Sequence, residues 1–260
     1  MRKKPKIVVI CTTPRSGSTH LCNLLLQTGN IGCCIEILEW VDGMRLNIFP
    51  HIAYKNHEDV LADFEGYVED IVKTFGSGKT HVAFKIHMYQ LTRWRKWGIW
   101  PLKIIRPDFY VFLERRNTLL QTISLGLAHQ TQAFTAEKKI QNEPIYNKEE
   151  LLSWEYFVRR NRLYWKLYFL FNRIRPTHVF YESLNKNLLP TLEHLLIELG
   201  VESNVPVNEI APEIEKQRTK LNYEWLKLYR KDRMSIGVLV ILFKKLMARL
   251  IPSIEKKNEP

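Results

Sequence analysis

The segment 6–20 constrains the fold of this chain more than any other, because it combines a buried strand, a compact polar turn and the start of a helix. Residues 7–11 form an apolar run with the length and β-branched content of a strand buried on both faces. Residues 12–18 are polar and are interrupted by Pro14 and Gly17. A strand, turn and helix in this order point backbone N–H groups and the positive end of a helix dipole at one place, which predicts an anion-binding site.

The side chains of this turn also suit an anion. Arg15 contributes a fixed positive charge, and several hydroxyl groups contribute donors. An ordinary strand-to-helix connection is the alternative, but it needs only one capping side chain. The candidate anion-binding residues are Pro14, Arg15, Ser16, Gly17, Ser18 and Thr19.

The turn differs from the P-loop of nucleoside-triphosphate enzymes. That loop requires a glycine at its start and a lysine after its second glycine, and here no glycine opens the turn and Ser18 follows Gly17. Kinase or ATPase activity is therefore less favoured. A small-molecule kinase remains an alternative that magnesium dependence would separate.

A second apolar run over residues 109–113 also leads into a helical pattern. Arg116 follows this strand, and Ser124 lies eight positions later, two helical turns along. The planar fork of an arginine can donate two hydrogen bonds to a phosphate. The alternative is that Arg116 lies at the start of a surface helix and that Ser124 is a small buried residue.

The segment 81–88 alternates in the manner of a strand, so that Lys85 and His87 share one face while Phe84 and Ile86 share the other. A histidine is a competent general base near neutral pH, and a lysine can stabilise developing negative charge. These side chains are candidate catalytic residues. The alternative for His87 is a structural hydrogen bond to a neighbouring strand.

The turn sequence T-P-R-S-G-S-T over residues 13–19 resembles the 5′-phosphosulfate loop of the sulfotransferases. These enzymes move a sulfuryl group from 3′-phosphoadenosine 5′-phosphosulfate (PAPS) to an acceptor hydroxyl. The resemblance implies that Arg116 and Ser124 bind the 3′-phosphate of PAPS. It also implies that Lys85 assists the phosphosulfate and that His87 takes the proton of the acceptor.

The pattern T-P-R-S-G-S-T-x-L-C-x-L-L-x-x-T-G-x-x-G, followed by Glu36, resembles the trehalose 2-sulfotransferase branch of that family. In that branch the glutamate is the general base toward a sugar hydroxyl, so the resemblance favours Glu36. A carboxyl group with an ordinary pKa near about 4 needs desolvation for this task, whereas a histidine does not, so intrinsic pKa favours His87. Both stay candidates. Cys33 and Cys34 replace the branch's usual Arg-Pro pair, which leaves acceptor recognition open.

Two later segments extend the resemblance. Residues 129–134 are similar to a signature of the branch and make Gln130 and Gln132 candidate acceptor contacts. Residues 215–225 resemble its final cofactor-lining segment, although a solvated charge run is the alternative. The candidate cofactor contacts in that segment are Lys216, Gln217 and Arg218.

The length of 260 residues and the 45% hydrophobic content suit one large α/β domain over residues 1–234. Helix-like segments, including a long one over 149–173, alternate with strand-like ones. The predicted strands are 6–11, 81–88, 109–115 and 177–182, with a less regular one near 31–37. This alternation predicts a P-loop-like parallel β-sheet flanked by helices on both faces, with the ligand at the carboxyl ends of the strands.

The cysteines indicate a reducing compartment. None of the four lies in a C-x-x-C pair, and the N-terminus lacks a secretory pattern, so we expect a cytoplasmic protein. The adjacent Cys33 and Cys34 do not suit an ordinary structural disulfide or a zinc site. Sulfuryl transfer does not require a metal, because arginine and lysine can stabilise its charge, so no metal site is predicted.

The net charge of +12 calls for anionic partners, and PAPS accounts for only part of it. Nucleic acid is excluded because no recognisable binding module occurs. The apolar and basic segment 235–251, within a C-terminal helical region over 235–260, is too short and too charged to span a bilayer. It suits a peripheral helix at the inner membrane surface. The alternative is a helix docked on the core or on the partner of a homodimer, a state that family relatives adopt.

The sequence therefore predicts a PAPS-dependent sulfotransferase that acts on a hydroxyl of a carbohydrate or glycolipid by in-line transfer. The alternative is a non-catalytic protein on the same fold that binds an anion or phosphoester, or associates with a membrane.

Overall fold

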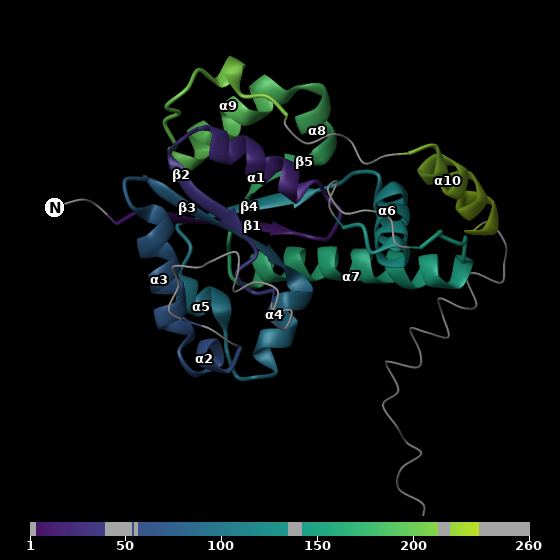
Figure 1. Ribbon diagram of the computed structural model, residues 1–260, viewed down its shortest axis with the longest axis horizontal. Coiled ribbons are helices and arrows are strands. Elements are labelled where there is room, and N and C mark those ends of the chain that lie inside the picture. The colour runs from purple at the N-terminus through teal and green to yellow at the C-terminus, as the bar shows by residue number, and fades with distance from the viewer. Residues whose placement is uncertain (1–3, 40–53, 55–56, 135–141, 213–218, 234–260) are drawn as a thin grey trace, which may run out of the picture.

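A parallel sheet forms the centre of the protein in the computed structural model, which describes residues 4–39, 54, 57–134, 142–212 and 219–233 (Figure 1). Within these residues the sheet has five strands in the order β2-β3-β1-β4-β5, and each neighbouring pair is parallel. The strands are β1 Lys6–Thr12, β2 Ile31–Ile35, β3 His81–His87, β4 Phe109–Glu114 and β5 Thr177–Phe180. Every predicted strand is confirmed, with ends that differ by a few residues.

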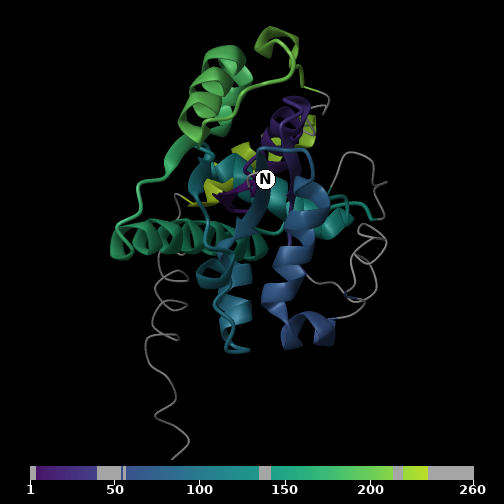
Figure 2. The ribbon, with the colours of Figure 1, turned by 90° about the vertical axis from the view of Figure 1, so that its left-hand side faces the viewer.

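Helices cover both faces of the sheet, as predicted. Helices α1, α8 and α9 pack on one face, and α3, α4, α5 and α7 pack on the other (Figures 1 and 2). The helices are α1 Ser18–Gln27, α2 His57–Ala62, α3 Phe64–Gly76, α4 Met88–Arg95, α5 Pro101–Ile105, α6 Thr118–Thr131, α7 Lys148–Phe171, α8 Tyr181–Lys186, α9 Leu188–Leu199 and α10 Lys220–Arg233. A short 3₁₀ turn spans Val207–Glu209. The α/β fold class predicted from the sequence is confirmed.

The central strand β1 is apolar because both of its faces are buried. Val8, Val9 and Ile10 are fully buried, and they alternate between the two hydrophobic clusters on either face of the sheet. A parallel strand with helices on both sides has no solvent-facing position, so it carries no polar alternation. The strand delivers the following turn to the edge where the carboxyl ends of all five strands meet.

The long helix α7 contributes the aromatic packing that its sequence indicates. Trp165 is fully buried, and its indole Nε1 donates a hydrogen bond to the carbonyl oxygen of Thr12 at 2.9 Å. The side chain of Asn147 caps the start of the helix by accepting a hydrogen bond from the N–H of Glu150. The helix therefore fixes the end of β1 where the polar turn begins.

One expectation about the cysteines is wrong. Cys22 of α1 and Cys34 of β2 form a disulfide, whereas Cys11 and Cys33 are free and buried. Neighbouring residues of a strand point to opposite faces of the sheet. Cys33 therefore packs in the hydrophobic cluster with α3, whereas Cys34 packs in the cluster on the other face, which contains Cys22 of α1. Adjacency in sequence therefore does not prevent one of the two from pairing.

Several predictions fall on parts of the chain outside the described residues. These are the helical segment 235–251 within 235–260, and the cofactor contacts Lys216, Gln217 and Arg218. Across the described ranges, no helix is long and apolar enough to cross a membrane. Membrane contact through 235–251, the cytoplasmic location and the homodimer stay predictions.

Candidate active site

The turn after β1, residues 13–17, is here called the anion cradle, because its backbone has the conformation of an anion-binding loop. Arg15 and Gly17 both have positive φ values, 62° and 90°. A Cβ atom on Gly17 would lie 2.2 Å from the ring of Tyr181, so both the backbone conformation and the contact require glycine. Alternation of left- and right-handed residues turns successive N–H groups toward one point.

Hydrogen bonds from α6 and within the turn itself hold the turn in place. Gln121 of α6 is almost fully buried, and its Nε2 donates to the Thr13 hydroxyl at 2.7 Å and to the Pro14 carbonyl at 2.8 Å. The hydroxyl groups of Thr12 and Ser16 are hydrogen-bonded to each other across the turn. These hydrogen bonds from buried side chains hold the turn in one conformation.

Helix α1 begins at Ser18, directly after the turn. Gly17 stands at its N-cap position, no side-chain hydrogen bond caps this end in the part of the chain that is described, and no acidic residue lies in the first turn. The first N–H groups of a helix have no partner within the helix, and they favour an anion. The N-terminus of α1 is therefore available to a negatively charged group.

Arg15 connects this cradle to α6. Its Nε donates to the Ser124 hydroxyl at 3.0 Å, and its Nη1 donates to the carbonyl of Phe134. Burial lowers the pKa of Arg15 from its ordinary value, and Tyr181 partly offsets that effect. An arginine remains charged under such a shift, so Arg15 supplies a fixed cation beside the turn.

The loop after β4 already holds an internal carboxylate. The N–H groups of Arg116 and Asn117 donate to Glu182 at 2.9 and 3.1 Å. Burial acts to raise the pKa of Glu182, but these N–H groups and then Arg115 hold it below its ordinary value. Glu182 thus satisfies the backbone donors here and leaves side chains to bind any external anion.

The guanidinium of Arg116 is exposed and lies 4.2 Å from the ring centroid of Phe180. Ser124, its predicted partner, instead accepts a hydrogen bond from Arg15. Arg116 and Ser124 therefore have different neighbours in this structure, and their joint role at a 3′-phosphate stays a prediction.

Three predicted catalytic side chains come together at the ends of β2 and β3. Glu36 Oε1 lies 2.7 Å from Lys85 Nζ and 3.7 Å from His87 Nε2. The side chains of Glu36, Lys85 and His87 are 18%, 12% and 6% exposed, so the cluster is largely shielded from water. Parallel pairing of Ile35 with Phe84 sets this proximity, because it places Glu36 beside Lys85.

The electrostatics of the cluster keep Glu36 ionised. Burial alone would raise the pKa of Glu36, but His87 and then Lys85, through charge and hydrogen bonding, hold it well below its ordinary value. The Nδ1 atom of His87 is buried without a hydrogen-bond partner among the described atoms. An unsatisfied buried nitrogen is costly unless a bound molecule or water supplies a partner, which is consistent with a ligand site.

The sequence interpretation missed the residue that organises this cluster. Gln90 is fully buried, and its Nε2 donates to Glu36 Oε2 at 3.1 Å and to Glu39 Oε2 at 2.7 Å. Its Oε1 accepts from the N–H of His87 at 2.8 Å. Gln90 stands at the N3 position of α4, whose N-cap residue is His87. The capping-box signature begins with serine or threonine, so it does not mark Gln90 in the sequence.

Two predicted acceptor contacts have internal partners instead. Gln130 donates to the Ile145 carbonyl at 3.0 Å and to Glu150 at 2.6 Å, and its Oε1 accepts from the N–H of Ile145. Gln132 donates to the carbonyl of His129 in its own turn. Both side chains stabilise the chain after α6, and their contact with an acceptor stays a prediction.

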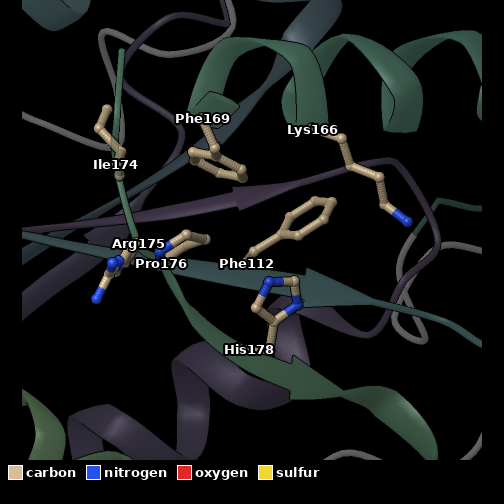
Figure 3. Close-up of a pocket in the computed structure, with 7 residues that line it drawn as sticks. All are labelled: Phe112, Lys166, Phe169, Ile174, Arg175, Pro176 and His178. Atoms are coloured by element: carbon tan, nitrogen blue, oxygen red, sulfur yellow. The ribbon is translucent and has the colours of Figure 1, made fainter. Parts of the chain in front are cut away.

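A pocket of about 500 Å³ lies beside α7 and the edge strand β5 (Figure 3). Lys166 and His178 line it, and both approach Glu114, at 3.5 and 3.7 Å. The complete lining is Phe112, Lys166, Phe169, Ile174, Arg175, Pro176 and His178. None of these is a predicted site residue. In the described ranges, no group of three or more metal-ligating side chains occurs.

Comparison with protein families gives a match to the model described as Stf0 sulphotransferase, over residues 7–92 and 102–232. Comparison with curated proteins gives no significant match. Among solved structures, the chain is 16% identical to a sulfotransferase domain from the curacin biosynthetic pathway, covering 83% of this chain and 80% of that one with a TM-score of 0.44. It is 15% identical to the sulfotransferase domain of the Synechococcus PCC 7002 olefin synthase. That match covers 88% of this chain and 96% of the olefin synthase domain, with a TM-score of 0.41. A mouse sulfotransferase complexed with PAP (3′-phosphoadenosine 5′-phosphate) is 13% identical to this chain. The match covers 92% of this chain and 67% of the mouse protein, with a TM-score of 0.38.

Proposed function

Since this chain belongs to the Stf0 sulphotransferase family and is a PAPS-dependent sulfotransferase, we propose that its acceptor is a hydroxyl of a carbohydrate or glycolipid. The observation that carries the proposal is the shielded cluster of Glu36, Lys85 and His87, which lies at the same edge of the sheet as the anion cradle. A carboxylate at this place is what the carbohydrate branch uses toward a sugar hydroxyl.

The residues of the chain fit a PAPS donor. Bound PAPS supplies the sulfuryl group and leaves as 3′-phosphoadenosine 5′-phosphate (PAP). The left-handed Arg15 and Gly17 and the N-terminus of α1 suit the 5′-phosphosulfate, which the residues from Pro14 to Thr19 would hold. Arg116 and Ser124 are proposed to bind the 3′-phosphate. Lys216, Gln217 and Arg218, outside the described residues, are proposed to line the same cofactor.

Glu36 is proposed as the group that accepts the proton of the acceptor hydroxyl. Its carboxylate is ionised and can accept a proton, although the lowered pKa of Glu36 reduces its strength as a base. Gln90 and Lys85 orient both of its oxygen atoms. Lys85 also supplies positive charge where negative charge develops during transfer. His87 is the alternative base, because it contacts Glu36 and has an unsatisfied Nδ1. General-base help of this kind contributes about 10²- to 10⁴-fold in rate.

The first experiment compares thermal stability with PAP, with ADP, and with ATP and magnesium. A ligand at about 100 times its dissociation constant adds about 2.7 kcal/mol to the free energy of unfolding, which gives a clear shift. We expect selective stabilisation by PAP. A preference for ATP with magnesium would instead support a kinase.

Turnover with PAPS is then measured against sugars, disaccharides and a glycolipid in detergent, with mass spectrometry detecting the added sulfuryl group. Sulfation of a sugar hydroxyl supports the proposed acceptor class. Sulfation restricted to phenols or amines would contradict the acceptor class while leaving the donor assignment intact. Binding of PAP without transfer to any acceptor would favour the non-catalytic alternative.

A further inference from the structure

The connection between α4 and α5 exposes two large aromatic side chains. Trp97 is 43% exposed and Trp100 is 46% exposed, whereas the preceding Trp94 is fully buried. Trp97 makes edge-to-face contacts with Trp94 and His57, at centroid distances of 5.6 and 4.7 Å. These contacts fix an exposed indole at the surface.

Basic residues surround these indoles. The segment 93–106, here called the tryptophan tip, contains no acidic residue. The Arg95 guanidinium lies 4.0 Å from the Trp100 ring centroid, and Lys103 Nζ lies 5.1 Å from it. The basic residues of the tip are Arg93, Arg95, Lys96, Lys103 and Arg106.

The elements beside the tip carry carboxylates that offset its charge: Asp63 and Glu65 lie at the start of α3, whose Phe64 contacts Trp94. Arg93 is paired with Glu39 at 3.5 Å, whereas within the described part of the chain the other four basic residues form no ion pair. The neighbouring helix α2 carries Glu58 and Asp59 in its first turn. Helices α2, α4 and α5 lie together at the lower end of the molecule in Figure 1, and the positive charge at this end is confined to the tip itself.

We infer that the tryptophan tip docks on the headgroup region of an anionic lipid bilayer. Indole rings are favoured at membrane interfaces because they are large, apolar and able to donate one hydrogen bond. Lysine and arginine beside them are attracted to anionic headgroups, each contributing about 1 kcal/mol near the surface. Cations stacked on exposed indoles combine both requirements in one place, and this charge complementarity favours an anionic lipid surface over a neutral partner.

The tryptophan tip lies close to the candidate active site, because the short helix α4 connects the two. Helix α4 begins at Met88, directly after His87, and ends at Arg95. A helix of this length spans about 12 Å, so the tip and the Glu36 cluster are about one short helix apart. If the acceptor is a glycolipid, which rests on the proposed function, docking brings its sugar headgroup close to the catalytic cluster. The docking itself does not depend on the chemistry of the site.

The test is co-sedimentation of the full chain with vesicles of phosphatidylcholine alone and of phosphatidylcholine mixed with phosphatidylglycerol. The test variants are the pair Trp97→Ala with Trp100→Ala and the pair Lys96→Glu with Lys103→Glu. Matched controls elsewhere on the surface are the pair Leu170→Ala with Phe171→Ala and the pair Lys186→Glu with Lys227→Glu. All these control side chains are exposed. The thermal shift caused by PAP in each variant verifies that its fold is intact.

We expect wild type and the controls to bind the anionic vesicles, and each test pair to weaken that binding by at least about tenfold. Equal binding to both kinds of vesicle, no binding to either, or test pairs that bind like wild type would overturn the inference. Binding to RNA that the test pairs abolish, without binding to vesicles, would also overturn it and assign the tip to nucleic acid. Turnover with a water-soluble acceptor should stay at wild-type level in the test pairs, so a failure of docking is distinguishable from a failure of the proposed function.

Discussion

Glu36 and Lys85 form an ion pair, with Oε1 of Glu36 2.7 Å from Nζ of Lys85, at the ends of two strands that are neighbours in the sheet but distant in sequence. The pair is largely shielded from water, and Gln90 holds the second carboxylate oxygen. This arrangement fixes a carboxylate and an ammonium at the same edge of the sheet as the turn after β1, so the proposed general base and the proposed charge-stabilising group need little rearrangement before reaction.

Replacing the proposed base should separate catalysis from donor binding. Glu36→Gln removes the proton acceptor but keeps the shape of the side chain, so we expect turnover to fall about 10²- to 10⁴-fold with little change in PAP affinity. Glu39→Gln is the matched control, since Glu39 is equally exposed and also bound by Gln90. Measurements of kcat and of PAP affinity by calorimetry check this. Full turnover in Glu36→Gln, with loss in His87→Asn, would assign the base to His87.

The ion pair also predicts how stability depends on pH. The pKa of Glu36 in the folded protein is held well below its ordinary value of 4.5 by His87 and Lys85, despite burial. A carboxyl group with a depressed pKa contributes stability that is present above its unfolded pKa and is lost as the pH falls through its folded pKa. The free energy of unfolding of wild type minus that of Glu36→Gln should therefore decrease as the pH falls below about 5. Urea unfolding at a series of pH values measures it, and an increase toward acid would contradict the assignment.

The arginine after β4 should distinguish ligands by their 3′-phosphate. Arg116→Ala is expected to weaken PAP binding about 10- to 100-fold, the value of a charged hydrogen bond, while leaving the binding of ADP nearly unchanged. Arg175→Ala, which removes another exposed arginine, is the control. Calorimetric titration with both ligands provides the comparison. Equal losses for PAP and ADP would place Arg116 away from the 3′-phosphate.

Arg15 should affect the binding of both PAP and ADP, because we propose that it contacts the 5′-phosphate group that the two ligands share. We expect Arg15→Ala to weaken PAP and ADP by similar factors, again about 10- to 100-fold. Ser124→Ala, combined with Arg15→Ala and with Arg116→Ala, shows which arginine Ser124 serves. Coupling to Arg116 in PAP binding would support a shared 3′-phosphate, whereas coupling only to Arg15 would make Ser124 a positioning residue for that side chain.

The cradle itself should be sensitive to a single methyl group. Gly17→Ala adds a Cβ that meets Tyr181 at 2.2 Å, in a residue with φ of 90°. Gly78→Ala is the matched control, because its φ is 74° but a Cβ there meets nothing within 4 Å. The control should lose about 1–2 kcal/mol of unfolding free energy from backbone strain alone. Gly17→Ala should lose more and should bind PAP weakly, and adding Tyr181→Ala should recover part of that loss. Urea unfolding tests the order, and equal losses at both glycines would contradict it.

The strand-turn-helix of residues 6–27 was predictable from sequence because its causes are local. A run of β-branched residues, a glycine at a left-handed position and a following helical pattern act over neighbouring residues, and they need no partner to be recognised. The same holds for β3, where alternation places Lys85 and His87 on one face. The order of strands and helices, and with it the parallel fold, followed from these local signals.

Contacts between distant segments depended on the tertiary structure. The pairing of β2 with β3 brings Glu36 to Lys85, and the burial of Gln90 between two carboxylates follows from that register. Packing of α1 on β2 likewise joins Cys22 to Cys34, which the sequence interpretation did not expect.

The sequence by itself determined the strands and helices, the glycine-containing turn after β1 and the residue types available for chemistry, because these depend on interactions between near neighbours in the chain. The tertiary structure alone decided that Glu36 is an ionised partner of Lys85 and His87, that Ser124 lies against Arg15, and that Glu182 satisfies the backbone donors after β4. Those arrangements depend on which strands become neighbours and in which register. The free energy that selects them comes from burial of the whole core, which no short segment of sequence contains.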